Sequence, residues 1–471
     1  TGGDFAELFF EDVLENNLYE QNGSLKKVES VRICGAGIYV LRGTGSAYVY
    51  TNDLSYEGLA AAAGQAAALL GAGALPGGGE RSGQGAFAGQ GPALPGAAGN
   101  GSQAAASFRK ASYASPNPFR VRPSSVPGRE RAALVSEAGR MALSCSPDLR
   151  QLEVAQFAKE QHVTIVNSEG LYTEEDRVTD RLRFTYVLDR GGQKKSGWGD
   201  YTKPQGWEAY DCLEPVRRTV KEILSGAAAS FDGKRVRACR VPVVMEAGVC
   251  GTLWHEACGH PLEASAISSH SSEYEGLLGQ RIAAEKVTLI DDGTIPGLYG
   301  SRAIDDEGHP TQKNVLIEKG VLKGYLCDRL GGRKLGMPST GSGRRQGYMY
   351  APVSRMNNTY LEVGQDAEED LLSSVDEGLY VKSFGGGSGG REFSLEVAEG
   401  YWIKNGEITY PVKGLMLTGK GPELLKNVDG VGRIQGYDGG GFCGAASGLC
   451  PVTSFQPRIR IREMSIGGEE A

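Results

Sequence analysis

The stretch Gly248-Val-Cys-Gly-Thr-Leu-Trp-His-Glu-Ala-Cys-Gly-His260 is the most informative segment of this chain for both fold and chemistry. It contains two of the five histidines, His255 and His260, with Glu256 directly after the first. Neutral imidazole is a common zinc ligand, and a neighbouring carboxylate can act as general base towards a metal-bound water. The pattern therefore predicts a metal site with both histidines as ligands and Glu256 as the catalytic base.

The spacing of the two histidines predicts an irregular helix. They lie five residues apart, which on a regular α-helix separates them by about 140° around the axis, so both rings could not face one ion. Gly259 tolerates unusual backbone angles, and Pro261 biases His260 away from the α-helical region. We expect a helix that carries the first histidine and distorts or ends near Gly259. The alternative, an ordinary core helix, would bury Glu256 as an unpaired charge.

Length, charge and cysteine content narrow the class of protein. The 471 residues predict two to three domains. The net charge is −7 without a run of like charge, which argues against nucleic acid as the main partner. No apolar stretch reaches the roughly 18 residues that a membrane span needs. The start of the chain resembles no secretory signal, and the nine scattered cysteines favour a reducing compartment. We therefore expect a cytoplasmic protein.

Residues 1–228 show alternating β-rich and helical patterns, which predict an N-terminal α+β domain. Asn22-Gly23 is a hairpin signal. Residues 8–14 are ambiguous between strand and helix. The other expected strands are Val31–Leu41, Ala47–Tyr50, Leu152–Ala158, Val163–Asn167 and Arg181–Leu188. The expected helices are Leu59–Leu70, Glu130–Leu143 and an amphipathic segment with Leu213, Val216, Val220, Ile223 and Leu224 on one stripe.

Two segments have the composition of connectors. Gly71–Ser107 is dominated by Gly, Ala, Pro, Gln and Ser, and contains only two charged residues, Glu80 and Arg81. Such a segment buries too little apolar surface to order itself, so we predict a flexible insertion at 71–107. Ser225–Lys234, rich in Gly, Ala and Ser, is the candidate linker between domains.

Residues 236–471 have mostly β patterns. Asp291-Asp292-Gly293 indicates a turn, and Lys319-Gly320 and Asn405-Gly406 indicate hairpins. Alternation of Arg458, Arg460 and Arg462 with isoleucines indicates a half-exposed strand. We expect an α+β protein whose C-terminal domain is a large antiparallel sheet, sandwich or barrel-like, with the metal-binding helix packed against it.

Several separate blocks resemble the TldD/PmbA family of zinc metalloproteases, and more closely its TldD branch, which keeps the metal motif. The HExxxH block matches Trp254–His260, and the other matching blocks occur in the family's order: Glu29–Gly43, Val287–Thr294, Thr340–Arg345, Arg355–Tyr360, Gly441–Gly444 and Gln456-Pro457. Only the insertion lacks a counterpart. The resemblance implies a Zn²⁺ site completed by a cysteine of the late Gly-rich loop, which here is Cys443. Chemistry permits this, because thiolate is a good zinc ligand.

Other side chains near the motif are weaker candidates. Cys258 and Cys450 are interpreted as small buried thiols, and Cys250 also lies close to the histidines in the sequence. Glu263 could support or complete the metal site, although an exposed or capping role is favoured. His270 and His309 have no partner motif, so each is interpreted as a surface or core histidine. Thr340–Arg345 is interpreted as a loop near the active site, because its glycine spacing does not follow the P-loop pattern.

These patterns lead to a zinc-dependent metallopeptidase that hydrolyses unfolded or extended peptides. The resemblance implies pairing with a related subunit that lacks the motif, and a homodimer is the other possibility. Two alternatives stay open: a structural or interaction subunit whose metal only stabilises the fold, and a metal-dependent amidohydrolase on small amides. A fourth protein ligand such as Cys258 or Glu263 would favour the structural role, because structural zinc sites are closed.

Overall fold

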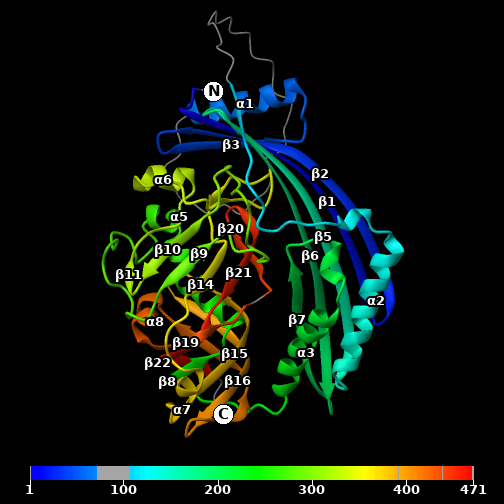
Figure 1. Ribbon diagram of the computed structural model, residues 1–471, viewed down its shortest axis with the longest axis vertical. Helices are drawn as coiled ribbons and strands as arrows, with labels where there is room; N and C mark the ends of the chain where they lie inside the picture. Colours follow the sequence, from blue (N-terminus) through cyan, green and yellow to red (C-terminus); the bar gives the residue numbers. More distant parts are fainter. Residues whose placement is uncertain (1, 72–106, 391, 438, 469–471) are drawn as a thin grey trace, which may run out of the picture.

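The computed structural model describes residues 2–71, 107–390, 392–437 and 439–468. Residues 72–106 of the predicted insertion therefore lie outside the described residues. The chain forms an α+β fold with two halves, and a long curved sheet from the N-terminal half lies along one side of the C-terminal half (Figure 1).

The N-terminal half is built on one sheet of unusually long strands. The order is β3-β2-β1-β5-β6, and β4 and β7 also pair with β6. The strands are β1 (Phe5–Gln21), β2 (Ser24–Arg42), β3 (Gly45–Thr51), β4 (Arg109–Ala111), β5 (Leu149–Asn167), β6 (Leu171–Arg190) and β7 (Gln193–Lys203). The ambiguous residues 8–14 lie in β1. The two strands expected at 152–158 and 163–167 form one strand, because buried Glu160 and Gln161 interrupt the apolar pattern without ending the pairing.

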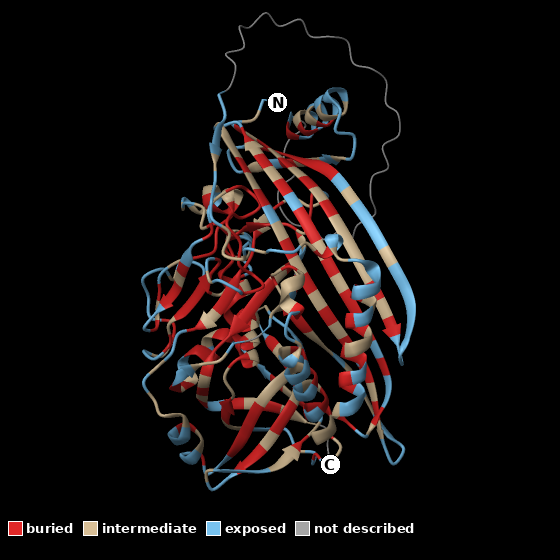
Figure 2. Ribbon diagram, turned by 45° about the vertical axis from the view of Figure 1, so that its right-hand side comes forward, coloured by how far each residue is buried: buried red, intermediate tan, exposed pale blue. Residues whose placement is uncertain are grey.

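Three helices pack on this sheet: α1 (Tyr56–Gly71), α2 (Gly128–Cys145) and α3 (Glu214–Ala229). The stripe predicted from the sequence is correct, since Val216, Val220 and Leu224 lie in a core shared with α2 and β6. Figure 2 shows the buried sides of the helices turned towards the strands. Helix α3 continues to Ala229, so the first part of the candidate linker is helical.

The C-terminal half contains a closed barrel and a second sheet. The barrel has the order β15-β8-β22-β18-β16, and it closes because β15 also pairs with β16. Its strands are β15 (Glu377–Ser388), β8 (Cys239–Met245), β22 (Pro457–Gly468), β18 (Leu415–Gly419) and β16 (Phe393–Lys404), with β17 (Glu407–Val412) and β19 (Val428–Gln435) on its sides. The expected barrel-like architecture is confirmed, but β8 and β15 are parallel, so the sheet is not purely antiparallel.

The second sheet has the order β11-β10-β9-β14-β21-β20 and ends at the hairpin β20–β21. Its strands are β9 (Leu289–Asp292), β10 (Lys313–Glu318), β11 (Val321–Leu322), β14 (Asn358–Leu361), β20 (Gly441–Ala445) and β21 (Gly448–Phe455). The short elements around it are α5 (Ala264–Ser268), α6 (Arg329–Leu335), β12 (Gly343–Arg344), β13 (Val353–Ser354), α7 (Glu368–Ser373) and α8 (Gly421–Asn427).

Three of the turn predictions are confirmed, and the fourth, at Asp291-Asp292-Gly293, is correct only at its end. There Gly293 lies in a turn and Oδ1 of Asp292 accepts a hydrogen bond from the backbone of Thr294 at 2.8 Å. Asn22, Lys319 and Asn405 all have positive φ, as their two-residue hairpin turns require. Asp291, however, is fully buried in β9, where it accepts hydrogen bonds from the backbone of Asn357 and the hydroxyl of Thr359. The neighbouring strand β14 supplies these donors, which the local sequence around Asp291 does not reveal.

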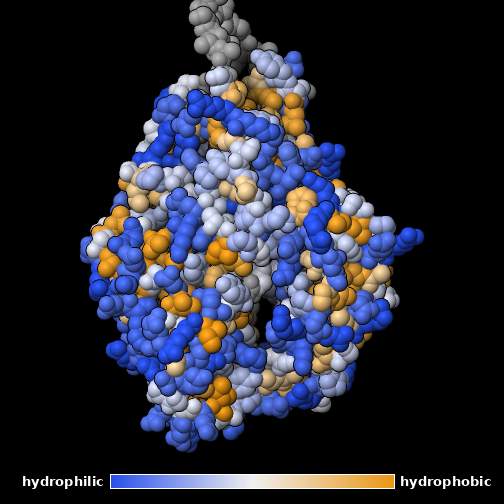
Figure 3. Space-filling view, in the orientation of Figure 1, coloured by the Kyte–Doolittle hydropathy of each residue, from blue (hydrophilic) through white to orange (hydrophobic). Residues whose placement is uncertain are grey.

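Apolar and ionic contacts join the two halves. Phe9 and Ile165 of the long sheet share a core cluster with Ile304 and Tyr348. On the face shown in Figure 3, apolar residues are scattered over both halves among hydrophilic ones, and the surface is hollowed between the halves. No helix among the described residues has the length and apolar character needed to span a bilayer.

Candidate metal centre

The local backbone explains how two histidines five residues apart can face one point. Helix α4 (Thr252–Trp254) leads into a π-helical turn, η4 (His255–Gly259), and then into a 3₁₀ turn, η5 (His260–Leu262). The backbone N–H of His260 donates to the carbonyl of His255, which is the i to i+5 bond of a π-helix. This bond places the two histidines one above the other. The predicted distortion of the helix is confirmed.

One detail of that prediction is wrong. His260 keeps α-helical angles, with φ −57° and ψ −45°, although Pro261 follows it. The narrow turn η5 accommodates the proline near its start, where no intrahelical donor is needed. Gly259 contributes through close packing instead, because a Cβ there would lie 1.9 Å from Sδ of Met356. The indole of Trp254 anchors the turn by donating to Oε1 of Gln456 at 2.6 Å.

The three predicted ligands come together. Donor atoms of His255, His260 and Cys443 all lie within 4.8 Å of one another. Cys443, on β20, places its Sγ 3.1 Å from Nε2 of His260, and the two imidazole rings have centroids 4.9 Å apart. Two imidazole nitrogens and one thiolate are a donor set that zinc accepts. Among the described residues, these three side chains are the only group of three or more His, Cys, Asp or Glu placed to hold a metal ion.

His255 has an unusual environment for a polar side chain. It is buried, and neither ring nitrogen has a hydrogen-bond partner among the described residues. Burial, reinforced by the charges of His260, Arg355 and Arg344, holds the pKa of His255 well below its ordinary value. The side chain is therefore a neutral imidazole with a free lone pair, which is the form that binds metals.

His260 is held on its other side by Glu263, whose Oε1 lies 3.3 Å from Nδ1. Burial disfavours the charged ring, but Glu263 and the Cys443 thiol outweigh it and raise the pKa of His260 to about 11. An ion bound here would displace that proton. Glu263 is only 5% exposed, so the expected exposed role is wrong. It does occupy the N-cap position of α5, but its side chain makes no capping hydrogen bond there. A carboxylate on the outer nitrogen of a ligand histidine fixes the ring orientation.

Two buried arginines position the hairpin that carries Cys443, and no role was predicted for either side chain. Arg355 donates to the carbonyls of Cys443 at 2.8 Å and Gly448 at 3.1 Å. Arg344 donates to the carbonyl of Pro451 at 2.6 Å. The loop Thr340–Arg345 thus contributes structural contacts at the site. Sequence patterns could not reveal this role, because a buried arginine that bonds to carbonyls has no pattern of its own.

Glu256 is half-buried beside the metal-ligand group. Burial raises its pKa, His260 opposes this, and Glu263 adds to it. Gly389, in the turn between β15 and β16, lies directly over this side chain, since a Cβ there would come within 2.6 Å of Oε2 of Glu256. Gly389 thereby leaves room for the carboxylate.

The remaining candidates have ordinary surroundings. Cys258 and Cys450 are buried free thiols outside the metal-ligand group. Burial raises the pKa of Cys258 to about 12, with Tyr274 opposing the shift. His270 is exposed and contacts Glu275, as expected for a surface histidine. His309 lies beside Arg329.

A group of two histidines and one cysteine on this fold is compatible with a metallopeptidase. Residues 238–468 match the model of the PmbA/TldA metallopeptidase C-terminal domain, and residues 6–70 match that of the PmbA/TldA metallopeptidase domain 1. The chain belongs to the PmbA/TldD family and is a metalloprotease.

Relatives of the chain extend over most of its length. The metalloprotease TldD homolog of Buchnera aphidicola (Acyrthosiphon pisum) is 28% identical, covering 99% of this chain and 93% of its own. A metalloprotease of Methanothermobacter thermautotrophicus is 35% identical over 74% of this chain and 76% of its own. The crystal structure of TldE from Thermococcus kodakarensis shares the fold, with a TM-score of 0.69 and 17% identity over 99% of this chain and 97% of that one.

Proposed function

We propose that the protein hydrolyses peptide bonds with a zinc ion held by His255, His260 and Cys443. The observation that carries the proposal is the buried, neutral His255 with two unpartnered ring nitrogens among the described residues. Leaving a buried polar group unsatisfied costs about 1–3 kcal/mol, and such groups are rare without a functional reason. A metal ion between the three donors would satisfy one of these nitrogens.

The number of donors favours hydrolysis over a structural metal. Structural zinc sites are usually closed by four protein ligands, whereas catalytic sites keep one position open. Glu263 contacts the outer nitrogen of His260, and Cys258 is outside the group. Neither of the fourth ligands considered from the sequence is therefore placed to close the site. The family membership supports a peptide rather than a small amide as substrate.

When bound, the ion would polarise the scissile carbonyl and make water more acidic. The residues of this chain would do the rest. Glu256 removes a proton from the attacking water and transfers it to the leaving amine, and its raised pKa suits it to hold that proton between the two steps. Glu263 keeps Nε2 of His260 directed at Cys443.

Glu256→Gln tests the base. We expect hydrolysis of an unstructured peptide to fall roughly 10²- to 10⁴-fold, as loss of a general base does. Zinc content, measured by elemental analysis, should stay at the parent level, because Glu256 is not a proposed ligand. Parent-level hydrolysis by this variant would remove Glu256 from the mechanism.

Cys443→Ala tests the third ligand, with Cys450→Ala as the matched control. The two cysteines lie directly opposite each other in the β20–β21 pair, and both are buried. We expect near-stoichiometric zinc in the parent and in Cys450→Ala, and a sharp loss in Cys443→Ala. Full zinc in Cys443→Ala would exclude it as a ligand.

The proposal extends to substrate form, assembly and location. Strand β20 carries Cys443 and is the last strand of the second sheet among the described residues, so an extended peptide can pair with its outer edge. An unfolded peptide is therefore the proposed substrate. The fold shared with TldE is compatible with a heterodimer of related subunits, and light scattering of the chain alone would separate that from a homodimer. Nine free cysteines agree with a cytoplasmic location.

A further inference from the structure

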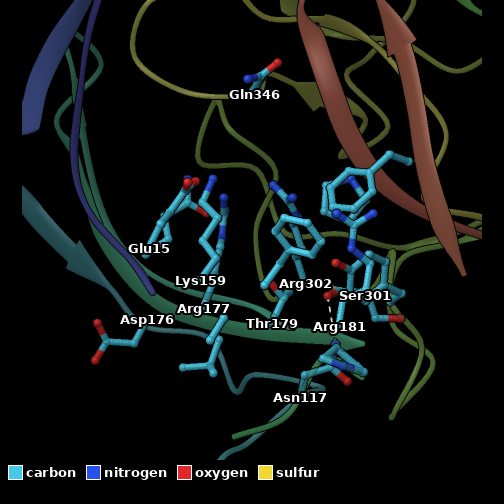
Figure 4. Close-up of a pocket in the computed structure, with 18 of the residues that line it drawn as sticks. Glu15, Asn117, Lys159, Asp176, Arg177, Thr179, Arg181, Ser301, Arg302 and Gln346 are labelled. Carbon is cyan, nitrogen blue, oxygen red and sulfur yellow. Dashed lines mark hydrogen bonds between the residues drawn. The ribbon is translucent and has the colours of Figure 1, made fainter. Parts of the chain in front are cut away.

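A cavity of about 250 Å³ lies between the long sheet and the β20–β21 hairpin. Its floor comes from β5 and β6, including Phe157, Lys159 and Arg181. Its other walls include Arg302 and Phe442 from the C-terminal half. Figure 4 shows side chains from both halves directed into this space. None of the proposed zinc ligands lines it.

The hairpin separates this cavity from the metal-ligand group. Residues directly opposite in an antiparallel pair lie on the same face, and successive residues alternate. Cys443 pairs with Cys450, and Phe442 pairs with Pro451. Phe442 and Pro451 line the cavity, whereas Cys443 contacts His260. The cavity wall is therefore one residue away from the proposed zinc ligand.

Arg181 has hydrogen-bond donors to spare. Its guanidinium lies between two aromatic rings, 4.4 Å from the centroid of Phe157 and 5.1 Å from that of Phe442. Its buried Nε has no partner among the described residues. Its ion pair with Asp200 is long, at 3.4 Å, because Arg183 already binds that carboxylate through two bonds of 2.8 Å.

Two further cations face the same space. Lys159 has no ion pair among the described residues, and Glu15, which also lines the cavity, lies opposite it in the β1–β5 pair. Arg302 contacts Asp306 at 3.2 Å, while Arg177 holds the same carboxylate at 2.6 Å.

The other acidic residues of the wall are already engaged. Arg177 and the backbone of Ala303 bind Glu175, and His162 and Arg122 bind Asp176. The cavity therefore has an excess of positive charge with unused donors.

We propose that this cavity binds a carboxylate of a peptide, either the chain end or an Asp or Glu side chain, next to an apolar residue. A guanidinium fork matches a carboxylate in geometry, and stacking between two rings fixes its plane. Phe157, Phe442 and Pro451 supply apolar walls for the neighbouring residue. The volume is below the roughly 300–1,000 Å³ of drug-sized sites, so it suits one or two residues.

The place of the cavity relative to the metal-ligand group indicates how far the bound carboxylate lies from the cleaved bond. This step rests on the proposed function. A peptide that pairs with the edge of β20 at the metal-ligand group, and then leaves that pairing to pass around the strand, would run from the metal face to the cavity face. Packed layers lie about 10 Å apart, and an extended chain advances about 3.3 Å per residue. The bound carboxylate would therefore lie about three residues from the cleaved bond.

Binding can be tested without hydrolysis, in the full chain carrying Glu256→Gln. Fluorescence anisotropy would compare three labelled hexapeptides of one apolar sequence: a free C-terminal acid, its C-terminal amide, and an amide with one internal Glu. We expect at least one carboxylate-containing peptide to bind about tenfold more tightly than the uncharged amide, as one charge-assisted contact provides. Preference for the free acid assigns the chain end, and preference for the Glu peptide assigns the side chain.

Arg181→Gln, added to this protein, should reduce the preference to less than about twofold. Arg190→Gln is the matched control, because it lies on the same strand and also stacks on an aromatic ring, but it pairs with Asp148 and does not line the cavity. It should keep the preference. Equal binding of acid, amide and Glu peptides, or an unchanged preference in Arg181→Gln, would overturn the proposal. Binding without any hydrolysis by the parent would count against the proposed function alone.

Discussion

Two buried polar clusters in this protein differ in how completely their members are paired. Around Asp306, at the junction of the two halves, Arg177 and Arg302 bind the carboxylate, and the backbone of Arg345 donates to it. Around His255, both ring nitrogens lack partners among the described residues. A buried carboxylate whose two oxygens are both bonded holds elements together, whereas a buried ring whose nitrogens lack partners is available to a ligand.

The pKa values of buried groups in these clusters depend on how completely the groups are paired. Burial disfavours ionised Asp306, but Arg177 and Arg302 outweigh it and hold its pKa well below the ordinary range. At His255 no neighbouring group opposes the effect of burial on the pKa, which is held well below its ordinary value, so the ring is neutral. Asp180 is intermediate, because Tyr210 and Gln156 donate to it but no ion pair is formed with it among the described residues. Changes at these sites should therefore have effects of different size and sign.

The largest effect on stability is expected for Arg345→Met. The side chain binds Glu7 at 2.6 Å, and both are fully buried, so its loss leaves a carboxylate without its partner across the two halves. Breaking such a pair costs about 3–5 kcal/mol. Urea unfolding would measure this loss of stability. Arg32→Met, which removes the exposed ion pair with Asp12, is the control and should change the stability little. Unfolding of Arg345→Met at the parent's midpoint would show that the paired cluster does not stabilise the junction.

A smaller, pH-dependent effect is expected for Asp180→Asn. Burial raises the pKa of Asp180 from 3.8 to about 7, with Tyr210 and Gln156 opposing. Between these values the folded state binds more protons than the unfolded state, so the stability that this carboxyl contributes is full at low pH and is lost as pH rises towards 7.

Asparagine does not titrate, so the stability of Asp180→Asn relative to the parent should increase between pH 5 and pH 8 by up to a few kcal/mol. Urea unfolding at both values measures this, provided that the parent unfolds reversibly. The control Asp211→Asn, at an exposed carboxylate, should change the free energy of unfolding by the same amount at pH 5 and at pH 8. A pH-independent difference in Asp180→Asn would contradict the raised pKa.

The smallest effect on the metal-free protein is expected for His255→Leu. Replacing an unpartnered buried polar group by an apolar one of similar size is nearly neutral or stabilising. The increase in melting temperature on adding zinc should, however, disappear, because the ion would lose a ligand. The exposed His270→Leu should keep that increase. A metal-free His255→Leu protein destabilised by several kcal/mol would mean that the histidine is part of the structural core.

Sequence patterns were sufficient wherever the physical cause is local. The two-residue turns at Asn22 and Asn405 follow from residues that accept positive φ. The α3 stripe follows from helical periodicity. The irregular helix between His255 and His260 follows from their spacing, since two rings five residues apart meet only if the turn is widened. These features depend on neighbours within about one turn.

Tertiary structure determined what depends on distant segments. Cys443 reaches the histidines because β20 ends the second sheet beside η4, and the sequence indicated this cysteine only through family resemblance. Glu263 and Asp291 were misjudged because their partners come from other elements. The cavity beside Arg181 exists only where the long sheet meets the hairpin. Local residue preferences establish each turn and helix, but the contacts of a buried polar side chain depend on which segments the fold brings beside it.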